Sequence, residues 1–353
     1  MHKPIALSTH KFATGGGIES YTIDLAKQLS NDGKKVKVYA SKFDHSLPEY
    51  SKIQPVLINQ KHTLKKLRPF FFTRQLNRIH HSDEYLIACN PSDYADIYIC
   101  GGTHLGYLKA MGQSPNLIDR LATYRNRTNY ATAKSIMAHS EMMRQELINL
   151  YNIPAQKIQT IHPPADTNRF THHSEGIAHI RQQYGWENGD VIFLFPSTGH
   201  KRKGLDLLAD YFKATNLPIR LAVAGSPLPY PIANVQELGF CKNMPDLYRA
   251  ADYTIMASIY EPFGLVGVES VLCGTRVVLS ENIACCEVMN GEAGFFFSRE
   301  DKHSLDQAIR QAVSLKQQGL HKINNPLAAL TYNPTLEHHI TKLYAMLEAL
   351  EHS

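Results

Sequence analysis

Residues 5–40 read IALSTHKFATGGGIESYTIDLAKQLSNDGKKVKVYA, and this stretch decides the fold class. It begins with a short apolar run and continues through three glycines at 15–17. Residues 18–29 then place apolar side chains at helical spacing, an Asn-Asp-Gly turn ends the helix, and a β-rich run follows at 36–40. The pattern predicts a strand, a glycine-rich turn, a helix and a second strand.

The same alternation continues along the chain. Further buried-strand candidates lie at residues 85–89, 97–100, 135–140, 158–164, 191–197, 219–225, 253–258 and 276–280. Strands that alternate with helices predict parallel sheets covered by helices, so the expected fold class is α/β.

Two domains are expected from the 353-residue length and from a restart of the pattern after Pro163-Pro164. We predict an N-terminal Rossmann-like domain at 1–168 and a C-terminal one at 169–335, both doubly wound parallel sheets. A last helical segment, 336–353, is expected to pack back on the first domain.

The composition is that of an ordinary globular protein, with 43% hydrophobic and 20% charged residues. No stretch approaches the roughly 20 consecutive apolar residues that a spanning helix needs, and the N-terminus does not resemble a secretory signal. We therefore expect a cytoplasmic protein. The six cysteines lack zinc-ligand spacing, and we expect neither a metal site nor a cofactor.

The strongest chemical motif is Glu261-Pro262-Phe263-Gly264-Leu265-Val266-Gly267-Val268-Glu269, which follows a predicted strand and opens a predicted helix. Open α/β sheets bind ligands at the carboxyl ends of their strands, where Glu261 would lie. The N–H groups of Gly264 and Leu265 would start the helix and suit a diphosphate. Glu269, two turns further on, suits paired ribose hydroxyls.

A second motif, Gly199-His200-Lys201-Arg202-Lys203-Gly204-Leu205-Asp206, follows the strand at 191–197. When a sugar–phosphate bond breaks, negative charge grows on the departing diphosphate. Cations positioned there stabilise the transition state more than the ground state. A solvated basic turn is the simpler alternative for both Arg202 and Lys203.

These motifs resemble family 4 glycosyltransferases, whose signature is two glutamates separated by seven residues. Residues 15–19, 163–170, 248–252 and 291–297 resemble, in order, the family's first loop, its inter-domain crossing, its helix-to-strand junction and its glycine-rich turn. The resemblance covers nearly the whole chain. It implies a GT-B fold, with two Rossmann-like domains that face a cleft.

The resemblance also assigns roles. It implies Lys203 on the diphosphate with Arg202 beside it, and Glu261, Phe263, Gly264 and Leu265 on the donor sugar and its phosphates. Many members carry an arginine where this chain has Ser197 and Thr198, which are also expected in the donor site.

The predicted first domain contributes three further candidates. Gly16 and Gly17 would let the backbone approach the donor phosphates, although glycines at such a turn often serve the turn alone. His104 follows the strand at 97–100, and the resemblance implies a histidine there at the reaction centre, with Thr103 as the alternative. The predicted catalytic residues are therefore Lys203, Glu261 and His104.

Residues 1–168 carry a net charge of +8, against −3 for the remainder. Basic stretches at 61–74 and 120–127 account for much of it, and they suit an anionic membrane surface, a phosphorylated glycan acceptor or plain solvation. No nucleic-acid-reading motif accompanies the charge. The protein could thus also bind peripherally to the inner face of the cytoplasmic membrane.

The resemblance implies a retaining, metal-independent enzyme that moves a hexose from a nucleotide-diphosphate sugar, with UDP-sugars favoured. The sequence is similar to lipopolysaccharide core glucosyltransferases, and this similarity implies a bacterial cell-surface glycan as acceptor. Two alternatives remain: a nucleotide-sugar epimerase of the same fold, and a non-catalytic module that binds glycans or nucleotides.

Overall fold

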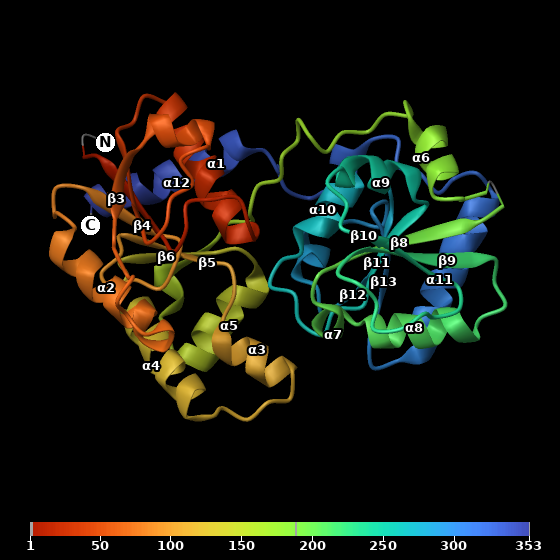
Figure 1. Cartoon of the computed structure of the whole chain (residues 1–353), viewed down its shortest axis with the longest axis horizontal. Coiled ribbons are helices and arrows are strands. Elements are labelled where there is room, and N and C mark those ends of the chain that lie inside the picture. The colour runs from red at the N-terminus through yellow and green to blue at the C-terminus, as the bar shows by residue number, and fades with distance from the viewer. Residues whose placement is uncertain (1–2, 188, 353) are drawn as a thin grey trace. The chain divides into compact units, whose positions relative to one another are not determined.

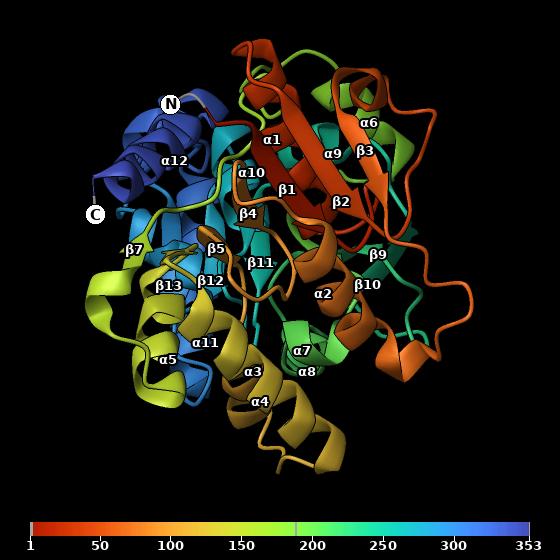
Figure 2. The same ribbon diagram turned by 90° about the vertical axis from the view of Figure 1, so that its left-hand side faces the viewer.

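A computed structural model describes residues 3–187 and 189–352 of the chain. It contains two compact units: Met1–His162 with Leu336–Ser353, and Pro163–Thr335. Each is a parallel sheet flanked by helices (Figures 1 and 2), as the α/β prediction required. The chain leaves the first unit slightly before the expected boundary at 168.

The first unit is built on a sheet in the order β3-β2-β1-β4-β5-β6-β7, with all paired strands parallel. Its strands are β1 (Ile5–Thr9), β2 (Val36–Ala40), β3 (Gln54–Leu57), β4 (Tyr85–Ala88), β5 (Ile97–Cys100), β6 (Ser135–Ala138) and β7 (Ile158–Thr160). Its α-helices are α1 (Gly17–Asn31), α2 (Arg68–Ile79), α3 (His104–Ala110), α4 (Leu117–Thr132), α5 (Glu141–Tyr151) and α12 (Leu336–Glu351), and its 3-10 helices are η1 (Pro48–Lys52), η2 (Lys65–Leu67) and η3 (Ala155–Lys157).

The second unit is built on a sheet in the order β10-β9-β8-β11-β12-β13, again with parallel pairs. Its strands are β8 (Val191–Ser197), β9 (Ile219–Gly225), β10 (Val235–Gly239), β11 (Tyr253–Met256), β12 (Val277–Ser280) and β13 (Gly294–Phe297). Its α-helices are α6 (Ile177–Gln183), α7 (His200–Lys203), α8 (Leu205–Ala214), α9 (Met244–Ala250), α10 (Leu265–Leu272) and α11 (Lys302–Gln317), and its 3-10 helices are η4 (Ala284–Val288) and η5 (Pro326–Ala329).

Every strand expected from an apolar run is present, but three strands were not expected. β3 and β10 lie at sheet edges and carry mostly exposed or half-buried residues, so their sequences lack the apolar run of a central strand. Residues 294–297 had been interpreted as part of a glycine-rich turn. They pair with β12 as β13, so that interpretation was incomplete.

Helix α12 belongs to the first unit, where it packs on α1. The apolar side chains of Ile340, Leu343 and Leu347 join the core of that unit. His339 fixes the contact, because its Nδ1 lies 3.0 Å from the carbonyl oxygen of His162 and its Nε2 lies 2.7 Å from the Tyr21 hydroxyl. These bonds fit a neutral ring that donates from Nδ1 and accepts at Nε2.

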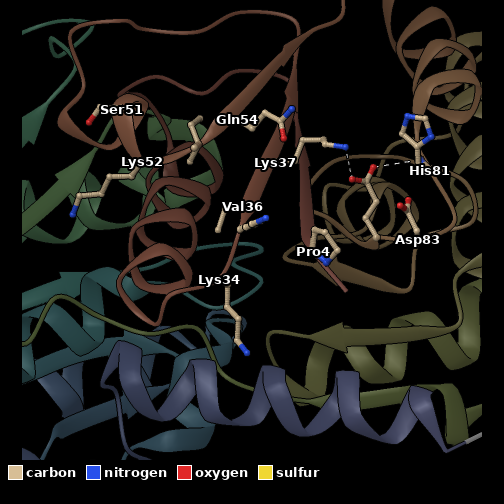
Figure 3. Close-up of a pocket in the computed structure, with 12 residues that line it drawn as sticks. Pro4, Lys34, Val36, Lys37, Ser51, Lys52, Gln54, His81 and Asp83 are labelled. Atoms are coloured by element: carbon tan, nitrogen blue, oxygen red, sulfur yellow. Dashed lines mark hydrogen bonds and ion pairs between the residues drawn. The ribbon is translucent and has the colours of Figure 1, made fainter. Parts of the chain in front are cut away.

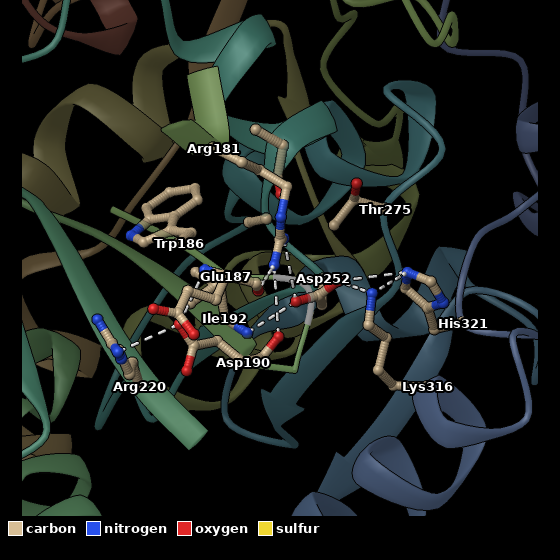
Figure 4. A network of polar contacts seen from close by, with 12 residues as sticks. Arg181, Trp186, Glu187, Asp190, Ile192, Arg220, Asp252, Thr275, Lys316 and His321 are labelled. Carbon is tan, nitrogen blue, oxygen red and sulfur yellow. Dashed lines mark hydrogen bonds and ion pairs between the residues drawn. The ribbon is translucent and has the colours of Figure 1, made fainter. Parts of the chain in front are cut away.

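A buried carboxylate organises the amino edge of the second sheet (Figure 4). Asp252 immediately precedes β11 and accepts a hydrogen bond from the Ile192 amide at 2.8 Å. It forms ion pairs with Lys316 at 2.7 Å and with Arg181 at 3.3 Å, and Nε2 of His321 lies 3.3 Å from its Oδ1. Burial alone would raise the pKa of Asp252, but the His321 hydrogen bond and the Arg181 charge outweigh it and hold that pKa well below its usual range.

None of the helices in the described part of the chain is long and apolar enough to cross a membrane.

Acid should weaken the first unit through two buried histidines. Burial lowers the pKa of His139 to about 3 and that of His339 to about 4, so both bind fewer protons folded than unfolded between those values and about 6.5. Stability then falls as pH falls through that window, by about 1.4 kcal/mol per pH unit for each histidine. Calorimetric unfolding between pH 7.5 and 4.5 measures this slope.

A His139→Phe variant should show a shallower pH dependence than the wild type. The exposed His303 on α11 supplies the control, since His303→Gln should leave the slope unchanged. Equal slopes in wild type and His139→Phe would show that His139 is not the source.

Candidate active site

Two predicted cationic residues lie in the turn that follows β8. Lys203 ends the single helical turn α7, and its Nζ donates to the carbonyl oxygen of Pro196 at 2.9 Å. Burial lowers the pKa of the Lys203 amine, and the nearby Glu261 carboxylate partly opposes that shift. Lys203 is therefore a desolvated cation at the carboxyl edge of the second sheet.

Glu261 approaches the same turn from the loop after β11. Arg202 donates through Nη1 to Glu261 Oε2 at 2.7 Å and to the Tyr260 carbonyl oxygen at 2.7 Å. The backbone of Glu261 is fixed as well, because its carbonyl accepts from the Ala284 amide at 3.1 Å. The structure thus brings Arg202 and Glu261 into direct contact beside Lys203.

The start of α10 completes this edge of the sheet. Gly264 has φ +92°, and a Cβ there would lie 2.7 Å from Ile283 Cγ2, so the position requires glycine. Phe263 is buried, and its carbonyl accepts from the Cys285 amide at 2.7 Å. Leu265 is the first helical residue, and the amides of a first helical turn have no partner within the helix.

Glu269 lies one helical turn further into the unit. Its Oε2 accepts from the hydroxyl of buried Tyr248 at 3.1 Å. Burial raises the pKa of Glu269, although the Tyr248 hydrogen bond opposes that shift. A carboxylate held this way has one oxygen left for a ligand hydroxyl.

The two polar residues at the end of β8 differ in their surroundings. Ser197 is buried, and its Oγ lies 2.8 Å from Nδ1 of His200. Thr198 is exposed, and its carbonyl accepts from the Ser226 hydroxyl at 3.3 Å. Neither side chain forms a hydrogen bond with Lys203 or Arg202.

The candidates in the first unit follow its own strands. Gly16 caps α1 and Gly17 begins it, and both are exposed. His104 begins α3, and its Nε2 lies 2.9 Å from Asp119 Oδ1 on α4. The Thr103 hydroxyl accepts from the Gly106 amide at 3.0 Å and donates to Glu146, so it serves the local fold.

Comparisons with known proteins show which family the chain belongs to. A model described as Glycosyltransferase Family 4 matches residues 15–169, and one described as Glycosyl transferases group 1 matches residues 177–325. A protein named probable transglycosylase from Burkholderia thailandensis is 39% identical over 345 residues, which cover 96% of this chain and 95% of that protein. The chain belongs to glycosyltransferase family 4.

Solved structures give the same fold. Anabaena HepE, crystallised with UDP and glucose, superposes with a TM-score of 0.76 at 18% identity and covers 99% of this chain and 100% of its own. WaaG, a glycosyltransferase involved in lipopolysaccharide biosynthesis, gives 0.75 at 16% identity and covers 90% of this chain and 93% of its own. The predicted GT-B fold is confirmed, and this family 4 glycosyltransferase is an enzyme.

Sequence reasoning missed several supporting groups of the glycosyltransferase. The carbonyl of Pro196 holds Lys203, and Tyr248 orients Glu269. Gly204, quoted only as part of a motif, has φ +80°, and a Cβ there would overlap the carbonyl oxygen of Ala257. A glycine directly after two cations was the available signal for such a close approach.

Separately, a cavity of about 570 Å³ lies at the amino edge of the first sheet (Figure 3). It is lined by lysines together with Gln54, His81 and Asp83. None of the predicted site residues lines it.

Replacing Gly204 with alanine should destabilise the second unit. The left-handed backbone and the overlap with Ala257 together should cost at least about 2 kcal/mol. Urea unfolding measures the loss. Gly291→Ala is the control, because Gly291 has open space around its Cα and no positive φ, and it should change stability by less than about 0.5 kcal/mol. Equal stabilities of the two variants would contradict the prediction.

Proposed function

We propose that this enzyme is a retaining, metal-independent glycosyltransferase that moves a hexose from a nucleotide-diphosphate sugar to a cell-surface glycan. The second unit binds the donor and the first binds the acceptor. The observation that carries the proposal is the meeting of Lys203, Arg202 and Glu261 at the carboxyl ends of adjacent strands.

The donor assignment rests on charge. Lys203 and the first amides of α10, at Gly264 and Leu265, supply positive potential where a diphosphate would gain negative charge on leaving. Because these groups can act in place of a divalent cation, no metal is required. Glu269 holds the ribose, and the Arg202–Glu261 pair contacts the donor, with Glu261 on its sugar.

The proposed reaction is a front-face displacement. The anomeric carbon loses its bond to the diphosphate oxygen and gains one to the acceptor hydroxyl on the same face of the sugar. The departing phosphate oxygen takes the hydroxyl proton, so no side-chain nucleophile is needed. His104 and the backbone at Gly16 and Gly17 are assigned to the reaction centre and the donor phosphates.

UDP-sugars are the favoured donors and a lipopolysaccharide core the favoured acceptor. HepE was crystallised with UDP and glucose, and WaaG takes part in lipopolysaccharide biosynthesis, which supports both choices by analogy. The family assignment argues against both alternatives, the epimerase and the non-catalytic module.

Peripheral attachment to the inner face of the cytoplasmic membrane is part of the proposal, and α4 supports it. Leu117, Ile118, Leu121 and Tyr124 follow helical spacing and are 83%, 59%, 48% and 70% exposed. Arg120 lies among them and Arg127 follows on the same helix, which suits an amphipathic helix on an anionic lipid surface.

Thermal unfolding with UDP-, GDP-, ADP- and dTDP-sugars, with and without EDTA, tests the donor. A donor present at about 100 times its dissociation constant should add about 2.7 kcal/mol of stability. We expect the shift with a UDP-sugar, unchanged by EDTA. A shift that EDTA abolishes would overturn metal independence, and no shift with any of these donors would overturn the donor assignment.

Lys203→Ala and Glu261→Ala should each lower sugar transfer at least about 100-fold, the scale of one lost transition-state contact. Lys201→Ala is the matched control, because Lys201 lies in the same turn and is exposed. Its turnover should stay close to that of the wild type. Near-full activity in Lys203→Ala or Glu261→Ala would remove that residue from the mechanism.

Leu117→Ser with Leu121→Ser should weaken sedimentation with vesicles that contain phosphatidylglycerol, because each change removes apolar surface available for insertion. Leu327→Ser, at a residue 59% exposed in the second unit, should have no effect. Unchanged sedimentation of the α4 variant at low salt would contradict membrane docking through this helix.

A further inference from the structure

A second basic cavity, of about 410 Å³, lies between α2 and α4 in the first unit. Its lining residues are Phe70, Thr73, Arg74, Asn77, Arg78, Asp93 and Arg125. The Thr73 hydroxyl donates to the carbonyl of Pro91 at 3.1 Å, just after the end of β4. The cavity therefore lies near the carboxyl edge of the first sheet, where α/β sheets bind ligands.

Three arginines, Arg74, Arg78 and Arg125, supply the positive charge of this cavity. Within the described ranges, the guanidinium groups of Arg74, Arg78 and Arg125 form neither an ion pair nor a hydrogen bond. The one lining acid, Asp93, accepts instead from Asn129 at 2.6 Å and from Asn77 at 3.5 Å. Arg74 and Arg78 are also one turn apart on α2, where like charges repel.

Arg125 is the most constrained of the three. It is half-buried, its guanidinium carbon lies 5.2 Å from the centre of the Phe70 ring, and its Nε is buried without a hydrogen-bond partner in the described residues. Burial lowers the pKa of Arg125, and the nearby Tyr98 and Asp93 partly oppose that shift. A buried donor without a hydrogen-bond partner costs free energy, which an anionic ligand would recover.

We propose that the cavity formed by Arg74, Arg78 and Arg125 binds a phosphate group of the acceptor. Three guanidinium groups suit this ligand, because each can donate paired hydrogen bonds to phosphate oxygens. The assignment rests on the proposed function, in which the first unit holds the acceptor. The phosphate belongs either to a phosphorylated sugar or to a phospholipid headgroup.

The lysine cavity of Figure 3 is a weaker candidate for such a ligand. Lys37 there forms an ion pair with Glu84 at 2.6 Å, and Lys52 donates to Asn31 at 3.1 Å. Two of the four lysines of that cavity already have polar partners, whereas none of the three arginines between α2 and α4 has one among the described residues.

Calorimetric titration with inorganic phosphate, without donor, tests the site directly. It is performed in the Lys203→Ala background, to reduce phosphate binding at the donor site. Arg125→Gln, and separately Arg74→Gln with Arg78→Gln, should each weaken phosphate binding at least about 10-fold, the scale of one lost charge-assisted hydrogen bond. The double variant changes only exposed side chains and should fold normally.

Arg127→Gln is the matched control, since Arg127 is an exposed arginine on α4 outside this cavity. Its phosphate affinity should equal that of the parent. Equal affinities in all three variants, or an equal loss in Arg127→Gln, would overturn the proposal.

Two competition arms identify the source of the phosphate. Displacement by glucose 6-phosphate but not by glucose indicates a phosphorylated sugar, and displacement by phosphatidylglycerol vesicles but not by phosphatidylcholine vesicles indicates a headgroup. The titrations contain no donor, so they measure phosphate binding independently of sugar transfer. If the arginine variants lose phosphate binding and the wild-type protein transfers no sugar, the phosphate site stands and the proposed function is refuted. If the wild-type protein transfers sugar but Arg125→Gln leaves phosphate binding unchanged, the proposed function stands and the phosphate site is refuted.

Discussion

The close approach of Gly204 to the end of β11 is the constraint on which the candidate active site depends. β8 and β11 are neighbours in the second sheet, and the turn after β8 passes directly over the carbonyl of Ala257. A side chain at Gly204 would push that turn away. With glycine there, the Ile259 amide donates to the Arg202 carbonyl at 2.8 Å, and the two strand ends share one hydrogen-bond network.

The close approach of the two strand ends removes charged side chains from water, which costs free energy unless those side chains find partners. Lys203 is desolvated, and a buried cation needs acceptors or opposite charge. The Pro196 carbonyl supplies the first, and the Glu261 carboxylate supplies the second at longer range. Arg202 takes the direct bond to Glu261, so Lys203 remains the cation with the least committed charge. That leaves it suited to a ligand that brings its own negative charge.

At the amino edge of the same sheet, the buried charge that needs partners is negative. Asp252 is a buried anion that pairs with Arg181 of α6 and Lys316 of α11, and His321, in the segment after α11, lies 3.3 Å from it. Lys322 lies close by, and its Nζ donates to the Thr275 hydroxyl at 2.8 Å. Burial lowers the pKa of Lys322 to about 7, so its amine loses its proton more readily than that of an ordinary lysine. These contacts join helices to the starts of strands, which keeps the sheet ends in register.

Much of this arrangement could be predicted from the sequence, and the failures have two causes. The central strands and the position of the motifs at carboxyl ends follow from apolar runs and from the rule for parallel sheets. That rule alone brings Lys203 and Glu261 together. Edge strands such as β3 escape because half-exposed residues carry no clear pattern. Contacts between side chains, such as Tyr248 with Glu269 and His104 with Asp119, could not be predicted because they depend on rotamers.

The charge of the first unit shows why counting residues is not enough. The net charge of +8 over residues 1–168 gives an excess of cations but does not say which of them are available to a ligand. Lys37 is neutralised by buried Glu84, and Lys134 pairs with Asp96 at 2.7 Å. Such pairs contribute to the fold and attract little at a distance. Arg125 instead is half-buried against Phe70 without an acid bound to it. An unpaired cation lowers the stability of the folded chain unless it is well solvated, and Arg125 is not, so its position near a strand end is better explained by binding than by folding.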